Sequence, residues 1–147
     1  MRLVVQRVKE ASVTIDNNVV GKINKGFLIY VGITDTDTEL EVEKLAKKIS
    51  TIRIFEDSEG KMNLDITKVE GEILVISQFT LYADMKRGNR PSFIKAARPE
   101  NAIPLYELFI LLLRENHHVE AGVFGADMKI HSINDGPVTI IYDTEDL

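Results

Sequence analysis

The spacing of apolar residues along the chain predicts a mixture of strands and helices. Residues 3–15 are rich in valine and alternate in part between apolar and polar positions, which indicates a strand. Asn17 and Asn18 follow it, and because asparagine tolerates positive φ we expect a hairpin into a second strand at 19–23. The continuous apolar run at 27–33 is typical of a third strand, buried on both faces.

Two later segments have the period of an amphipathic helix. The first covers about residues 38–50, and either Thr36 with Glu39 or Thr38 with Glu41 has the spacing of a capping box. Its apolar positions are Val42, Leu45, Ala46 and Ile49. The second helix covers about residues 99–115. Its expected buried face is Leu105, Leu108, Phe109, Leu112 and Leu113.

The remaining apolar segments predict five more strands. These lie at 52–56, 72–82, 119–124, 127–133 and 138–142. Turn residues at 57–60 and 134–137 separate some of them, the second as an ordinary Asp-Gly hairpin signal. The sum is a single α+β domain, dominated by strands, with two main helices that cover one side.

Length and composition fit this picture. The chain has 147 residues, enough for one domain with its own core, and no cysteine, which excludes thiol chemistry and suits an aqueous, reducing compartment. The first ten residues do not read as a signal peptide. The longest apolar run, at 103–113, is interrupted by Pro104 and Glu107 and is too short for a membrane span.

Charge is unevenly distributed. A formal net charge of −5 argues against general binding to nucleic acids, DNA included, because such binding rests on many contacts from Lys and Arg to phosphate. Residues 85–99 nevertheless contain no acidic residue. They carry the basic residues Lys86, Arg87, Arg90, Lys95 and Arg98. This segment is either a solvated loop or a binding surface for phosphate groups.

Polar residues enter an otherwise apolar strand at Ser77-Gln78-Phe79-Thr80. A hydroxyl there could attack a carbonyl if a base removed its proton, and backbone N–H groups could hold an oxyanion. The sequence offers no obvious base: His117 and His118 follow the second helix, and His131 lies in a strand. Polar side chains satisfied within a sheet are the simpler alternative.

Two glycine-containing segments are further candidates. Gly136-Pro137 is rigid and poor in side chains, so it could present bare carbonyls to a ligand instead of merely closing a hairpin. In the segment 122–128, Phe124 and Met128 could line a pocket or simply belong to the core. Motifs for metals, nucleoside triphosphates and dinucleotides do not occur, so we expect no metal and no cofactor. Hydrolysis, or binding without chemistry, remains.

Together these segments resemble the D-aminoacyl-tRNA deacylase family, and the resemblance spans almost the whole chain. The matching motifs are V-Q-R-V at 5–8, F-x-D-x-x-G-K-M-N at 55–63, S-Q-F-T-L at 77–81, R-P-S-F at 90–93, G-x-F-G-A-x-M at 122–128 and N-D-G-P-V-T at 134–139. The resemblance implies a cytoplasmic homodimer with β/β/α layers and an active site at the subunit interface. Its reaction is hydrolysis of the ester between a D-amino acid, or glycine mischarged on tRNA for alanine, and the terminal adenosine.

The resemblance also implies roles for single residues. Ser77, Gln78, Phe79 and Thr80 form the catalytic segment, with either Thr80 as nucleophile or the ribose 2′-OH of the substrate assisting water. The Gly136-Pro137 peptide is cis in the family and enters the partner's pocket, where it rejects L-aminoacyl groups. Phe124 and Met128 line the pocket. With such a substrate, the excess of basic residues further predicts that Lys86, Arg87 and Arg90 contact acceptor-stem phosphates. A non-catalytic RNA-end binder and a general esterase that uses Thr80 are the alternatives.

Overall fold

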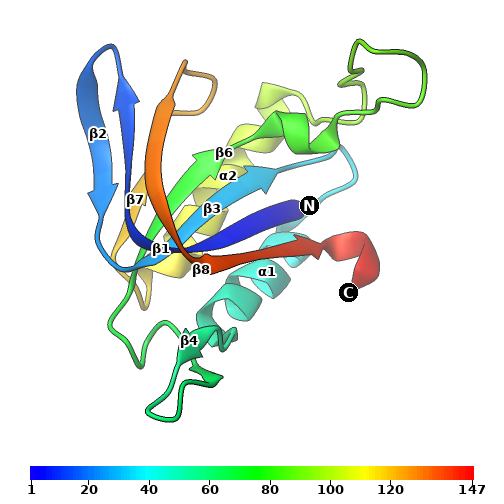
Figure 1. The fold of residues 1–147 in the computed structure, drawn as a ribbon. Coiled ribbons are helices and arrows are strands. Elements are labelled where there is room, and N and C mark those ends of the chain that lie inside the picture. Colours follow the sequence, from blue (N-terminus) through cyan, green and yellow to red (C-terminus); the bar gives the residue numbers. More distant parts are fainter.

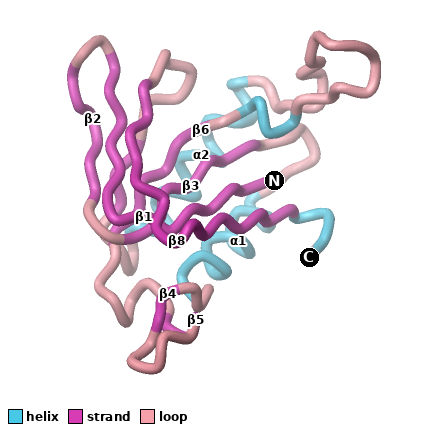
Figure 2. The backbone as a smooth tube through the Cα atoms, in the orientation of Figure 1, coloured by secondary structure: helices cyan, strands magenta, loops and turns pink.

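The computed structural model describes residues 1–147 and contains eight strands, two α-helices and two short 3-10 helices (Figures 1 and 2). In chain order they are β1 (Arg2–Ile15), β2 (Asn18–Ile23), β3 (Gly26–Gly32), α1 (Glu39–Thr51), β4 (Phe55–Glu56), β5 (Met62–Leu64), β6 (Glu72–Ser77), η1 (Phe79–Tyr82), α2 (Pro99–Arg114), β7 (Val119–Ala121), β8 (Lys129–Asp143) and η2 (Thr144–Asp146). No helix has both the length and the apolar character needed to cross a membrane.

One mixed sheet forms the centre of the fold. Its strand β1 pairs with three others: β2, β3 and β8. The strand order is β2-β1-β3-β6-β7, and β8 pairs with β1 in addition. The first half of β1 pairs with β3 and its second half with β2, while β8 follows β1 along most of its length. The sheet therefore bends, so that β2, the C-terminal half of β1 and the N-terminal half of β8 rise away from β3 and β6 (Figure 1).

Two apolar clusters separate three layers, as the β/β/α expectation requires. Alternate residues of β3 point to opposite faces: Phe27 and Ile29 contact the larger cluster under the helices, and Leu28 contacts the smaller one. The smaller cluster joins β3 and β6 to the bent part of the sheet, through residues such as Val13 and Leu74. Both α-helices lie on the other face, where α1 and α2 connect pairs of parallel strands.

The helices begin where the sequence indicates. Thr38 caps α1, and Glu41 completes the capping box. Pro99 is the first residue of α2. The predicted buried face of α2 was partly wrong: Phe109 and Leu113 are buried as predicted, but the helix is rotated so that its other buried positions differ. The buried positions are Ala102, Tyr106, Phe109, Ile110 and Leu113, and the predicted Leu105, Leu108 and Leu112 are only partly buried.

Several strand boundaries also differ from expectation. The strand predicted at 72–82 ends at Ser77, and the chain continues as the 3-10 helix η1. The strand predicted at 52–56 is reduced to Phe55–Glu56, and that predicted at 119–124 to Val119–Ala121. The largest difference is at 134–137, which form no hairpin turn: β8 runs through them as one strand.

The reason is a bulge in β8, in which four residues lie opposite one residue of β1. Gln6 pairs with Thr139 and Val8 with Asn134, so that Arg7 alone faces residues 135–138 of β8. The extra residues leave the ladder, and the strand then resumes with the same partner. Gly136 and Pro137 are exposed, whereas Val138 is buried in the core. The Asp-Gly turn signal at 135–136 therefore lies within a strand that pairs with β1 on both sides of it.

Candidate active site

The segment Ser77–Thr80 lies where β6 ends. The backbone N–H of Gln78 still donates to Val31 O at 2.7 Å, after which the chain turns into η1. Arg2 Nη1 donates to Leu81 O at 2.6 Å and thereby ties η1 to the start of β1. The carboxyl end of a parallel strand is the usual place for a ligand site in sheets of this kind.

A pocket of about 240 Å³ opens beside this segment. Its lining comes from two parts of the chain: Ile76, Ser77, Gln78 and Phe79 on one side, and Phe124, Gly125, Ala126, Asp127, Met128 and Ile130 on the other. Parallel pairing of β6 with β7 brings the second part alongside the first. The sequence-predicted residues Ser77, Gln78, Phe79, Phe124 and Met128 are thus adjacent.

Close packing fixes the second wall of the pocket. A Cβ atom on Gly122 would lie 2.5 Å from Met128 Sδ, so glycine is what lets Met128 fold back over the sheet. Phe124 packs edge-on against Tyr106, with ring centroids 5.8 Å apart. Tyr106 in turn donates its hydroxyl to Val75 O at 3.1 Å, and burial raises its pKa to about 12, so it remains a donor. Phe124 and Met128 therefore pack on the core and line the pocket at once.

The polar groups at the pocket are few. Gln78 Nε2 donates to Thr80 Oγ1, which fixes the two side chains relative to each other. Phe79 and Thr80 are the first two residues of η1, where backbone N–H groups have no acceptor within the helix. An oxyanion beside η1 could accept from both.

No histidine serves Thr80 as a base. His117 Nε2 lies 3.0 Å from Ser50 Oγ, His118 lies near Glu72 and Glu120, and His131 lies 3.3 Å from Glu10. The carboxylate of Asp127 is largely exposed and pairs with Lys129. Within one chain, the Thr80 hydroxyl therefore lacks the partner that would activate it as a nucleophile. No three His, Asp or Glu side chains gather into a metal site anywhere in residues 1–147.

Gly136 and Pro137 form the exposed tip of the bulge in β8. The peptide bond between them is cis, and Gly136 has φ +133°. They do not line the pocket of their own chain, so the structure does not bring them together with Ser77–Thr80 in one protomer.

Comparison with known proteins decides the family. The family described as D-Tyr-tRNA(Tyr) deacylase matches residues 4–143. The D-aminoacyl-tRNA deacylases of Flavobacterium psychrophilum and Brevibacillus brevis are 54% and 57% identical to the chain, over 99% and 98% of it and 98% and 100% of their own lengths. The chain belongs to the D-Tyr-tRNA(Tyr) deacylase family. It is accordingly a hydrolase.

Solved structures agree with this fold. A protein described as "c-Myc DNA Unwinding Element Binding Protein" superposes with a TM-score of 0.92 at 39% identity, covering 98% of this chain and 99% of that one. A probable eukaryotic D-amino acid tRNA deacylase superposes with a TM-score of 0.82 at 17% identity, covering 96% and 97%, and shows the same fold. The resemblance of the sequence motifs to the deacylase family is confirmed.

Sequence reasoning gave no role to Arg7, which is the one charged residue of this deacylase that is buried as a whole residue. Its guanidinium donates to Ile54 O at 2.8 Å and to Asp135 O at 3.0 Å, directly beneath the bulge. Asn134 Oδ1 accepts the N–H of Val138 at 3.1 Å from the other side. A signal was present: Arg7 continues the inward alternation of Leu3 and Val5, where an arginine is unexpected.

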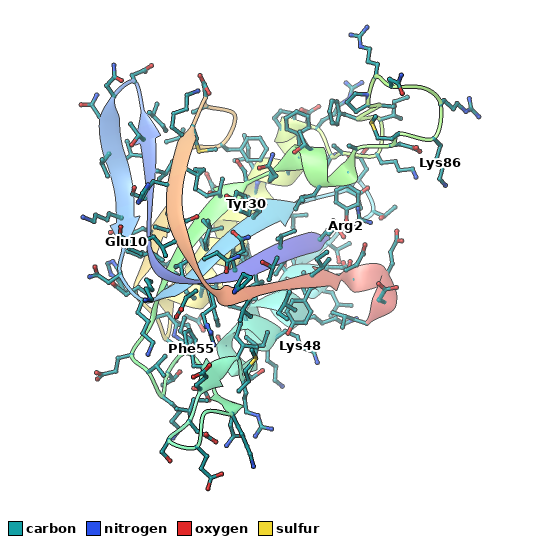
Figure 3. All side chains as sticks on the ribbon, viewed as in Figure 1. Arg2, Glu10, Tyr30, Lys48, Phe55 and Lys86 are labelled. Atoms are coloured by element: carbon teal, nitrogen blue, oxygen red, sulfur yellow. The ribbon has the colours of Figure 1, made fainter.

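The basic residues Lys86, Arg87 and Arg90 all lie on one loop that projects beyond η1 (Figure 3, where Lys86 is labelled). The three side chains are exposed, and with Lys95 they line a hollow of about 370 Å³. Phe93 of the same loop contacts Phe79 edge-on, with ring centroids 4.9 Å apart. The loop thus adjoins the pocket of the deacylase.

Proposed function

We propose that this deacylase hydrolyses the ester between a D-amino acid and the 3′-terminal adenosine of tRNA, and releases both. The observation that carries the proposal is that Ser77, Gln78 and Phe79 line one pocket together with Phe124 and Met128, in a chain of this family. The apolar wall suits an adenine ring or an apolar amino-acid side chain, and the polar edge suits the ester. We place the reaction in the cytoplasm, where aminoacylated tRNA is used.

The chemistry follows from what the pocket holds and lacks. Water attacks the ester carbonyl, the negative charge that develops on its oxygen is held by the N–H groups of Phe79 and Thr80, and the ribose oxygen leaves with a proton. Because no side chain is placed to accept the proton of the attacking water, we assign that role to the 2′-OH of the terminal ribose. Gln78, held by Thr80, orients the ester or the adenosine.

Discrimination between mirror images is assigned to a second copy of the chain. Gly136 and Pro137 are exposed at the tip of a supported bulge, a geometry that allows them to enter the pocket of a partner. Main-chain carbonyls facing the α-carbon exclude an L-side chain by shape, whereas apolar contacts distinguish substrates by only about 1–3 kcal/mol per methylene. Glycine has no side chain to exclude, so glycine mischarged on tRNA for alanine is a substrate in this scheme.

A paired assay tests the proposal. D-Tyr-tRNA, L-Tyr-tRNA and glycine attached to tRNA for alanine are incubated with the protein, and the ester that remains is measured over time. We expect rapid loss of the D-ester and the glycyl ester, with the L-ester decaying at its spontaneous rate. Protection of all three esters would instead show an RNA-end binder, and equal loss of D- and L-esters would remove the chiral role of Gly136-Pro137.

The role of Thr80 is tested separately. Thr80→Ala should retain most activity on D-Tyr-tRNA, whereas a tRNA that ends in 2′-deoxyadenosine should be a poor substrate for the unaltered protein. The reverse pattern would make Thr80 the nucleophile. Thr80→Ser is the matched control, because it keeps the hydroxyl that accepts from Gln78 Nε2.

A further inference from the structure

The loop at residues 84–95 is held in a defined shape, which is unusual for so polar a projection. Asp84 and Ser92 exchange two backbone hydrogen bonds, of 2.8 and 3.0 Å, across its neck. The Asp84 carboxylate also accepts the backbone N–H of Lys86 at 2.9 Å and lies 3.4 Å from Lys95 Nζ. These contacts hold the pKa of Asp84 below its usual range. The loop is therefore preorganised, which lowers the entropy cost of binding.

The preorganised loop forms a basic cup. Its hollow of about 370 Å³ is lined by Lys86, Arg87, Arg90 and Lys95, together with Asp84, Ser92 and Ile94. Asp84 is the one acidic side chain of the lining, and it is already engaged by Lys86 N–H and Lys95. Positive charge remains in excess, on a chain whose net charge is −5. Such a local excess favours a polyanion, and the arginines suit phosphate oxygens in particular.

Apolar side chains stand exposed beside the basic ones. Ile94 is 89% exposed and Met85 is 53% exposed, and Phe93 lies between the cup and the pocket because its ring contacts Phe79. Aromatic and apolar surfaces next to a basic track are how proteins bind single-stranded nucleic acid, since unpaired bases can stack on them. A duplex offers its phosphates but keeps its bases stacked inside, so it would leave Ile94 and Met85 in water.

We propose that residues 84–95 bind the single-stranded nucleotides that precede the terminal adenosine of tRNA, with phosphates in the basic cup and a base against Phe93 and Ile94. The inference rests on the proposed function for the position of the terminal adenosine. It differs from the expectation that the basic residues contact the acceptor stem. Because only the Phe79–Phe93 pair lies between the pocket and the cup, the nucleotides next to the terminal adenosine reach the cup before the stem does.

The test compares three D-tyrosyl esters of increasing length: adenosine, the 5′-phosphorylated trinucleotide CCA, and whole tRNA. The variant K86A/R87A/R90A should lower kcat/KM for the trinucleotide and for tRNA by tenfold or more, relative to the value for the adenosine ester. Ile94→Ser should lower the same ratio by a smaller factor. The matched control is K44A/K47A/K48A, which removes three exposed lysines from α1 and changes the net charge equally.

Salt dependence gives a second readout. Three single-strand phosphate contacts contribute a slope of about −2 in log K against log salt, so between 50 and 200 mM salt the unaltered protein should lose roughly 20-fold more kcat/KM on the trinucleotide than K86A/R87A/R90A does. The control variant should retain the slope of the unaltered protein.

The outcomes separate the two proposals. A loss confined to whole tRNA would place the contacts on the stem and overturn the inference, as would unchanged ratios for both longer substrates. If no ester is hydrolysed at all, the proposed function fails. The loop is then tested by fluorescence anisotropy with the uncharged, labelled trinucleotide, where equal affinity of K86A/R87A/R90A and K44A/K47A/K48A overturns the inference and a tenfold weaker affinity of the former supports it. Tighter binding of a DNA duplex than of the trinucleotide would also overturn it.

Discussion

Replacing Arg7 by methionine tests how the bulge in β8 is held. Arg7 is 6% exposed, and its guanidinium donates to Ile54 O in a buried position and to Asp135 O in a partly buried one. Methionine keeps much of the apolar volume but donates nothing. An acceptor left without a partner costs about 1–3 kcal/mol, more when it is fully buried, so the two carbonyls together should cost about 3–4 kcal/mol. For a chain of this length that is a fall in Tm of about 10 °C.

Two measurements follow for this variant. Urea unfolding gives the loss of stability, and deacylation of D- and L-Tyr-tRNA shows whether the bulge still performs its proposed role. Lys9→Met is the matched control, since Lys9 is an exposed cation on the same strand. If Arg7→Met and Lys9→Met unfold at the same urea concentration, the two hydrogen bonds contribute nothing measurable and the reasoning is refuted. Arg7→Lys should lie between them, because a single ammonium group cannot repeat the guanidinium fork.

Two further predictions concern stability. Thr38→Ala removes the capping box that Thr38 forms with Glu41, and should lower the free energy of unfolding by about 1 kcal/mol in urea titrations, whereas Thr38→Ser should not. Burial lowers the pKa of His117 below its ordinary value. As pH falls below about 6.5, the unfolded chain therefore binds a proton at His117 before the folded chain does. The free energy of unfolding declines from that pH until the pKa of the folded state is passed. His117→Gln, which can still bond Ser50, should flatten this decline in urea midpoints measured from pH 7.5 to 5; an unchanged decline would assign it to other groups.

Local sequence patterns predicted the fold well where local interactions decide it. The valine-rich strand β1, the hairpin into β2 and the capped helix α1 each depend on periodicity or on neighbours a few residues away, and all three are present. The turn of the hairpin lies one residue earlier than predicted, at Asp16 and Asn17, which both have positive φ. The predicted hairpin at 134–137 was wrong for a physical reason. An Asp-Gly pair permits a turn, but whether the chain reverses depends on β1, more than 120 residues earlier, which pairs on both sides of the bulge.

In the pocket, too, single residues could be identified from local sequence, but their proximity could not. Ser77 was noticed because a polar residue enters an apolar strand, and Phe124 and Met128 because glycines surround them. That they meet could not be read from spacing, since it depends on the parallel pairing of β6 with β7 across the whole of α2. Resemblance to the deacylase family supplied that link. Arg7 was missed because its signal, a charge at an inward position of a strand, has meaning only when its distant acceptors are known.

Gly136→Ala, compared with Gly60→Ala, distinguishes two reasons why the bulge needs glycine: a positive φ and the lack of space for a Cβ atom. Gly136 has φ +133°, and a Cβ atom there would lie 2.8 Å from Val138 Cγ2 and 3.0 Å from Arg7 Nη2. Gly60 also has positive φ, +76°, but a Cβ on it would meet nothing within 4 Å. Gly60→Ala should therefore cost only the conformational penalty, about 1 kcal/mol, whereas Gly136→Ala adds a collision with the residue that supports the bulge and should cost about 3 kcal/mol.

The comparison is made by urea unfolding and by the ratio of D- to L-Tyr-tRNA hydrolysis. We expect Gly60→Ala to leave that ratio unchanged, since Gly60 lies in the turn between β4 and β5. Gly136→Ala should lower D-Tyr-tRNA hydrolysis more than its loss of stability explains, because the added methyl group meets Val138 and Arg7 at the tip itself. Equal behaviour of the two variants in both assays would mean that the bulge accommodates a side chain freely. Its shape could not then serve as a filter that distinguishes one mirror image from the other.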